Sequence, residues 1–290
     1  MRNLPLPNGT SAAIVGSRGF LGRALAVKLR SAGDTVLEYD KGELTPTALA
    51  ELTQVNTIFW AASTINPAIA ETAPEKVIAD HGDVAEFLTN LIKINANARF
   101  VFFSSGGTVY GRGVVPFRET SPTHPISAYG KAKLALEETV TSRFPNSVIL
   151  RIANAYGPGQ HPAPGQGVIS HWLQAVAQRK PLKIIGDLHT IRDYLFIDDL
   201  TTALVQVHQA QEMPRVMNLG SNTPTTLSDV LAAVENAVSQ DALAIEQVSA
   251  RSFDLGDVWL DSTLAQQHLK WCPKVSLTEG IRETWNWIKT

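Results

Sequence analysis

Two side chains that could carry acid–base chemistry stand four residues apart in the segment Tyr129-Gly130-Lys131-Ala132-Lys133. Positions i and i+4 of a helix are neighbours on one face, so this spacing would bring the phenol and the ammonium together. A nearby positive charge favours the phenolate, which should lower the pKa of Tyr129 from about 10. Such a phenol could exchange a proton with a sugar or alcohol hydroxyl while another group takes up hydride. Surface pairs share this spacing, so the pair needs support from the rest of the chain.

A glycine-rich turn near the N-terminus indicates a dinucleotide-binding unit. Residues 11–16 read as a short buried strand, residues 16–22 as a Gly-xx-Gly-xx-Gly turn that opens a helix, and residues 35–40 as a second strand ending in an acid. This is the required context of the dinucleotide fingerprint, in which glycines let the backbone approach a pyrophosphate at the helix N-terminus. The cofactor contacts expected here are Gly16, Gly19, Phe20, Leu21 and Gly22.

The charges at the end of the second strand bear on which dinucleotide binds. Asp40 should accept hydrogen bonds from the adenosine ribose and repel a 2′-phosphate, which favours NAD over NADP. Arg18 and Lys41 favour NADP, since either could reach such a phosphate. We expect NAD, with NADP as the less favoured alternative. Further cofactor contacts are expected where the next apolar strand ends, at Ala61, Ala62 and Ser63.

The alternation of buried strands and helices up to residue 154 predicts an α/β fold with a Rossmann-type doubly wound parallel sheet. Beyond Pro158 the pattern changes, and a smaller α/β C-terminal substrate lobe is expected. Substrate should then bind between the two parts. The expected division assigns residues 1–156 and 192–220 to the NAD-binding domain, and residues 157–191 and 221–290 to the sugar-nucleotide-binding lobe.

The composition excludes several classes of function. Charged residues make up 18% of the 290 residues and the net charge is −2, so no nucleic-acid partner is indicated. Cys272 is the only cysteine, which excludes an internal disulfide and fits a cytoplasmic protein. The seven histidines show no metal-ligand spacing, so no metal is expected. No apolar run reaches the ~18 residues of a membrane span.

Six short motifs follow one another along the chain. They are Gly16-xx-Gly19-xx-Gly22, Ser104-Ser105-Gly106-Gly107-Thr108-Val109-Tyr110-Gly111, Tyr129-xxx-Lys133, Leu150-Arg151-Ile152-Ala153-Asn154, Arg192-Asp193-Tyr194 and Arg251-xx-Asp254. In this order they resemble the extended short-chain dehydrogenase/reductases, in the NAD-dependent epimerase/dehydratase family of sugar-nucleotide enzymes. The resemblance covers nearly the whole chain and is greatest to UDP-glucose 4-epimerase-like proteins.

The resemblance implies a role for each matching residue. Tyr129 would be the general acid/base and would also contact the cofactor, and Lys133 would hold the nicotinamide ribose. The two downstream arginines would clamp the substrate phosphates, because guanidinium forks suit two-oxygen recognition. By spacing alone, surface pairing with neighbouring acids would be the simpler interpretation of both arginines. The implied substrate contacts are Thr108, Asn154, Val168, Arg192, Arg251 and Asp254.

The hydroxyl that assists the tyrosine departs from the family pattern. In the family it usually lies four residues before the tyrosine of the Val-Tyr-Gly motif, and here that position is Gly106. Some members use the hydroxyl one place earlier, which makes Ser105 the expected catalytic helper and Thr108 the reserve. The acid pair that 4,6-dehydratases carry in this loop is replaced by Gly107 and Thr108, so dehydration is disfavoured. Residues 80–83 read Asp-His-Gly-Asp where an asparagine is common.

Together these features predict an NAD-dependent nucleotide-sugar epimerase, specifically a UDP-hexose 4-epimerase with a 4-keto intermediate. The alternative is an NAD(P)H-dependent 4-keto-sugar-nucleotide reductase, because the same tyrosine, lysine and hydroxyl serve both reactions. A non-catalytic NAD-binding relative is disfavoured by the intact Tyr129 and Lys133. The resemblance also implies a homodimer in which the helices at 74–94 and 127–143 of two subunits form a four-helix bundle.

Overall fold

The centre of the molecule is a six-stranded sheet in which every pairing is parallel. The computed structural model describes residues 11–239, 243–249 and 256–290. In spatial order the strands are β10 (Val216–Leu219), β5 (Ser147–Ile152), β4 (Arg99–Ser105), β3 (Thr57–Trp60), β1 (Ser11–Val15) and β2 (Thr35–Tyr39). The chain order reverses between β1 and β3, which makes the carboxyl end of these two strands the expected ligand crevice.

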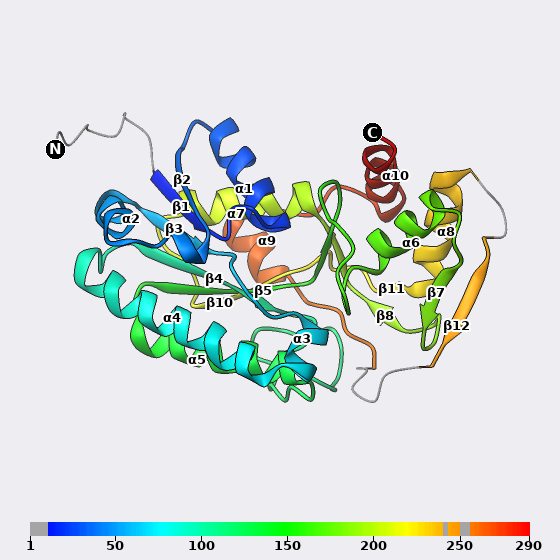
Figure 1. The fold of residues 1–290 in the computed structure, drawn as a ribbon, viewed down its shortest axis with the longest axis horizontal. Coiled ribbons are helices and arrows are strands. Elements are labelled where there is room, and N and C mark those ends of the chain that lie inside the picture. Colours follow the sequence, from blue (N-terminus) through cyan, green and yellow to red (C-terminus); the bar gives the residue numbers. More distant parts are fainter. Residues whose placement is uncertain (1–10, 240–242, 250–255) are drawn as a thin grey trace.

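Helices cover both faces of the sheet, as Figure 1 shows. One face is covered by α1 (Phe20–Ser31) and α7 (Ile197–Gln209), the other by α2 (Pro46–Glu51), α4 (Pro74–Ile94) and α5 (Ala128–Arg143). Each face has its own hydrophobic core, because successive side chains of a strand point to opposite faces of the sheet. Along β1, Ile14 packs in the core of the first face and Val15 in the core of the second. The short elements between are η1 (Lys41–Glu43), η2 (Leu52–Gln54) and α3 (Pro67–Thr72).

A smaller lobe stands beside the sheet at the carboxyl ends of its strands (Figure 1). Its elements are α6 (Val168–Ala177), β7 (Leu182–Ile185), α8 (Leu227–Val238), β12 (Ile245–Val248) and α10 (Leu277–Ile288). Strand β7 pairs with β12 outside the main sheet, and Trp172 of α6 donates from its ring to the Lys183 carbonyl at 2.9 Å. Two pairs of short strands lie between the sheet and the lobe. Strand β6 (Asn154–Tyr156) pairs with β9 (Tyr194–Phe196), and β8 (Ile191–Arg192) pairs with β11 (Thr225–Thr226). The remaining helix is α9 (Thr263–Leu269).

The predicted fold class is confirmed. The sheet is doubly wound and parallel, and a smaller α/β lobe follows it. Neither part is one continuous segment of the sequence, because α7 and β10 return to the main sheet after the first lobe elements. The division of the chain into two domains at the predicted residues stays a prediction.

Candidate active site

A cleft of about 1150 Å³ lies between the carboxyl end of the sheet and the smaller lobe. The glycine turn after β1, the end of β4 and the start of α5 form its sheet side, and α6, β7 and the strand β8 form its lobe side. This position agrees with the crevice expected from the reversal of strand order. The cleft therefore brings the two predicted halves of the site together.

Two glycines of the turn are required by the packing of the protein itself. Gly16 has φ +92°, and a Cβ there would lie 2.5 Å from the Ala62 nitrogen. A Cβ at Gly22 would lie 2.2 Å from the Gly16 carbonyl oxygen. The first glycine thus permits β1 to approach the end of β3, and the third permits α1 to approach the turn.

The second glycine of the turn leaves a space that suits a ligand. A Cβ at Gly19 would meet a single described atom within 4 Å, the Gly16 oxygen at 3.4 Å, and Gly19 lines the cleft. Gly19 is also the N-cap of α1, and the residues after it are Phe, Leu, Gly and Arg, so no carboxylate occupies this helix terminus. Backbone N–H groups and the helix dipole there favour an anion, so the residues present fit a dinucleotide diphosphate.

The tyrosine and lysine are placed by the start of α5. Ser127 caps this helix, its hydroxyl accepting from the Gly130 nitrogen at 3.1 Å, so Tyr129 lies in the first turn and Lys133 one turn later. Both line the cleft. Lys133 is 5% exposed, and its Nζ donates to the Phe103 carbonyl at 3.2 Å and lies 5.7 Å from the centre of the Tyr129 ring.

The pKa values of this pair differ from the expectation. Burial, aided by the charge of Asp80, raises the pKa of Tyr129 above its usual value. Burial also lowers the pKa of Lys133 to about 8. The prediction that the lysine lowers the pKa of Tyr129 is therefore wrong for the ligand-free protein. The ammonium lies over the ring and is directed to Phe103, so burial outweighs its attraction for a phenolate.

The hydroxyls at the end of β4 are placed differently from one another. Ser105 lines the cleft together with Tyr129, whereas Thr108 does not. The Thr108 hydroxyl is buried and has no hydrogen-bond partner among the described residues. A side chain at Gly106, the usual family position, would meet Leu260 Cδ1 at 2.5 Å, so Leu260 fills the space that another residue there would need.

The remaining predicted cofactor residues divide into two groups. Those that line the cleft are Gly19, Phe20, Leu21, Gly22, Ala61 and Ser63. Gly16, Asp40 and Ala62 lie outside the lining, the first and third because they pack against each other. Asp40 follows β2 and pairs with Arg18, at 3.0 Å between Oδ2 and Nη1.

Three of the four predicted substrate residues that the structure describes line the cleft, and Thr108 is the exception. The three are Asn154, Val168 and Arg192. Asn154 donates from its side chain to the Asp193 carbonyl at 2.9 Å, and Arg192 Nη1 donates to two backbone carbonyls at 2.8 Å. Arg251 and Asp254 lie outside the described residues. Local sequence patterns did not identify three further lining residues, His171, Lys180 and Lys183.

The structure also contains a buried polar network under the cleft that the sequence patterns did not predict. Glu137 accepts from the Ser104 hydroxyl and forms an ion pair with Arg151, at 2.7 Å between Oε2 and Nη2. The Arg151 guanidinium lies 4.8 Å from the centre of the Tyr110 ring, and Tyr110 donates to the Asn218 side chain at 2.6 Å. Arg151 could have indicated this network in the sequence, because a charged residue inside a fully buried strand requires a buried partner.

Two negative findings concern the described residues alone. Among residues 11–239, 243–249 and 256–290, no group of three or more His, Cys, Asp or Glu side chains could hold a metal ion. Within the same ranges, no helix combines the length and apolar character needed to cross a membrane.

The fold and the cleft define a dinucleotide-binding protein of the short-chain dehydrogenase/reductase type. Residues 12–220 match the NAD dependent epimerase/dehydratase family, and the chain belongs to this family. The predicted resemblance and the prediction of NAD as cofactor are thereby confirmed. Its members are NAD-dependent epimerases and sugar-nucleotide oxidoreductases.

Individual relatives represent both kinds of enzyme. A dTDP-4-dehydro-6-deoxyglucose reductase from Escherichia coli is 28% identical over 92% of this chain and 94% of its own. A UDP-glucose 4-epimerase from Mycolicibacterium smegmatis is 33% identical, but the match covers 64% of this chain and 61% of the epimerase. The chain thus spans less than two thirds of that epimerase.

Solved structures agree over nearly the whole chain. The UDP-glucose 4-epimerase of Thermotoga maritima with UDP-glucose is 26% identical, with a TM-score of 0.85 and coverage of 97% of this chain and 99% of its own. The UDP-glucuronic acid 4-epimerase of Bacillus cereus, solved with UDP-glucuronic acid and NAD, has a TM-score of 0.87 with the same coverage. At 21% identity the second likeness shows the fold alone.

Proposed function

We propose that this protein is an NAD-dependent nucleotide-sugar epimerase that inverts C4 of a UDP-linked hexose through a 4-keto intermediate. The observation that carries the proposal is the convergence of Tyr129, Lys133 and Ser105 on one cleft. The glycine turn borders this cleft on one side, and lobe residues that include Lys180, Lys183 and Arg192 border it on the other. A cofactor and a nucleotide sugar would therefore meet at the tyrosine.

The residues of the chain supply proton transfer and positioning. A bound dinucleotide would supply the acceptance and return of hydride. Tyr129 would take the proton of the C4 hydroxyl and later give it back, and Ser105 would hold that hydroxyl by a hydrogen bond. Lys133 would hold the nicotinamide ribose and, with the charge of the oxidised ring, favour the phenolate. Thr108, Asn154, Val168, Arg192, Arg251 and Asp254 remain the proposed substrate contacts, and Gly16, Asp40 and Ala62 remain proposed cofactor contacts.

The purified protein is expected to carry NAD and to interconvert UDP-glucose and UDP-galactose without consuming it. Absorbance and mass of the material released by denaturation identify the dinucleotide, and chromatography of the sugar nucleotides measures the conversion. Protein that lacks bound dinucleotide and interconverts no UDP-hexose pair would contradict the proposal. UDP-glucuronic acid is a useful second substrate in the same assay.

A 4-keto-sugar-nucleotide reductase is the second candidate. The observation in its favour is the match along 94% of the Escherichia coli reductase, whereas the match to the Mycolicibacterium smegmatis epimerase covers 61% of that protein. The same three side chains would then deliver a proton to the 4-keto oxygen. Stoichiometric oxidation of NADH or NADPH by a 4-keto sugar nucleotide would identify this activity, since an epimerase regenerates its cofactor.

We also propose that the protein is a homodimer through α4 and α5. One side of α4 packs inside the subunit, where Val84, Phe87, Leu88 and Leu91 are buried. The opposite face leaves Ile78 74% exposed. Changing Ile78→Arg should therefore give monomers in light scattering, while Val27→Arg on α1, which covers the other face of the sheet, should not. A monomeric wild-type protein would contradict this.

The proposed location is the cytoplasm. Cys272, the only cysteine of the chain, is a free and exposed thiol, which fits a reducing compartment. Cell fractionation of the native host would test this location, and recovery of the protein outside the cytoplasmic fraction would contradict it.

A further inference from the structure

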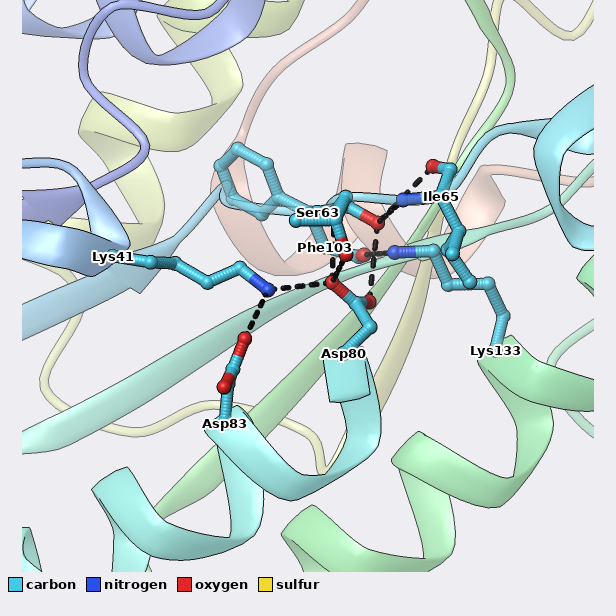
Figure 2. A network of polar contacts seen from close by, with 8 residues as sticks. Lys41, Ser63, Ile65, Asp80, Asp83, Phe103 and Lys133 are labelled. Atoms are coloured by element: carbon cyan, nitrogen blue, oxygen red, sulfur yellow. Dashed lines mark hydrogen bonds and ion pairs between the residues drawn. The ribbon is translucent and has the colours of Figure 1, made fainter. Parts of the chain in front are cut away.

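Lys41 follows the predicted ribose acid in the chain, yet it is held by two carboxylates of α4. Its Nζ donates to Asp80 Oδ1 and to Asp83 Oδ2, both at 2.7 Å. Asp80 is 1% exposed and also accepts from the Thr64 nitrogen at 2.8 Å, so its carboxylate is fixed in place. Figure 2 shows the lysine ending between the two acids. We call Lys41, Asp80 and Asp83 the Lys41 clamp.

The second cation near the end of β2 is also paired with two carboxylates, although its side chain is 69% exposed. Arg18 pairs with Asp40 at 3.0 Å and forms a hydrogen-bonded ion pair with Glu43 of η1. The hydrogen bond from the Asp40 nitrogen, supported by Arg18, lowers the pKa of Glu43, which keeps this acid ionised at neutral pH. The two cations, Arg18 and Lys41, are thus each paired with two carboxylates, and the four acids leave a formal charge of −2.

The acid that Arg18 contacts, Asp40, directly follows β2, and the end of this strand is where NAD and NADP differ. In the doubly wound fold the end of β2 faces the adenosine ribose, and NADP carries an added phosphate on its 2′-oxygen. Binding that phosphate requires a cation free to donate to it. We propose that the Lys41 clamp selects NAD: Asp80 and Asp83 draw Lys41 onto α4 and so withhold it from a 2′-phosphate. This rests on the dinucleotide-binding part of the proposed function and is independent of the sugar.

Two competing roles for the Lys41 clamp would give different results on mutation. The clamp could serve only to fix η1 and residues 63–65 to α4, in which case breaking it changes stability but not the choice of dinucleotide. The acids could also repel NADP by their charge alone, in which case their loss helps NADP whether or not Lys41 is present. Selection through Lys41 requires that any gain in NADP affinity depend on the lysine.

The test compares Kd values for NAD⁺ and NADP⁺ by calorimetry on full-length protein freed of bound dinucleotide. The main variant is Asp80→Asn with Asp83→Asn, because asparagine keeps the oxygen that accepts from the Thr64 nitrogen but removes the charge that holds the lysine. Its affinity for NADP⁺ relative to NAD⁺ should rise about tenfold over wild type, as expected for one charge-assisted hydrogen bond. Lys41→Met in the wild-type background should give no gain in NADP⁺ affinity, since the lysine is already withheld.

Adding Lys41→Met to the double variant should cancel its gain. A gain that survives without Lys41, or no gain at all in folded protein, would overturn the proposal. If the double variant does not fold, Asp83→Asn alone, at a half-exposed position, should still improve NADP⁺ binding about threefold, and a failure there also overturns it. Wild-type protein that binds neither dinucleotide would contradict the proposed function itself, so the two failures are distinguishable.

Discussion

Replacing Tyr129 with phenylalanine is expected to lower kcat by about 10²–10⁴-fold, the usual contribution of a positioned acid–base group. The ring and its contact with the Lys133 ammonium remain, so NAD binding should change little. Only the hydroxyl that exchanges the proton is removed. The measurement is the rate of UDP-glucose and UDP-galactose interconversion under saturating substrate, with NAD content determined on the same protein.

A matched control removes a different buried phenol. Tyr110 is 1% exposed, donates to Asn218 Oδ1 at 2.6 Å and does not line the cleft. Tyr110→Phe should therefore lower the free energy of unfolding by about 1–3 kcal/mol, because Asn218 loses a buried partner, while kcat stays near wild type. If Tyr129→Phe loses less than about tenfold in kcat, Tyr129 is not the acid–base group.

Much of the fold follows from local patterns. The helix expected at 74–94 is α4, Pro74–Ile94, because its apolar period is strong and Pro74 fixes its start. The glycine turn and its flanking strands were equally clear from the local pattern, and Gly22 meets a local constraint at the Gly16 oxygen, although Gly16 itself packs against Ala62 at the end of a different strand. The return of β10 to the edge of the main sheet depends instead on pairing with β5, about seventy residues earlier, which no short window records.

The sequence predicted those parts of the site in which interacting residues are close along the chain. It did not predict those in which the partners are far apart in sequence. Tyr129 and Lys133 meet because they are one helical turn apart. The sequence could not show that Lys41 meets Asp80, a residue 39 positions away, or that both cations near β2 are paired. The predicted direction of the Tyr129 pKa shift was wrong for the same reason, because burial depends on packing from several elements at once.

Replacing Arg151 with methionine is expected to lower the free energy of unfolding by about 3–5 kcal/mol, the usual effect of removing one partner from a buried ion pair. Arg151 and Glu137 are 6% and 4% exposed, and three of their hydrogen bonds join the guanidinium to the carboxylate. Methionine has a similar length but no charge, so Glu137 would be left buried without its cationic partner. Urea unfolding at neutral pH measures the loss.

The double variant Arg151→Met with Glu137→Leu should recover most of that stability, because a buried ion pair replaced by apolar side chains is often energetically neutral. The matched surface control is Arg118→Met, whose pair with Asp261 spans 3.1 Å but leaves the arginine 70% exposed. That change should cost at most about 1 kcal/mol. Equal losses for Arg151→Met and Arg118→Met would contradict the argument, since desolvation of Glu137 is what makes the buried pair sensitive to losing one member.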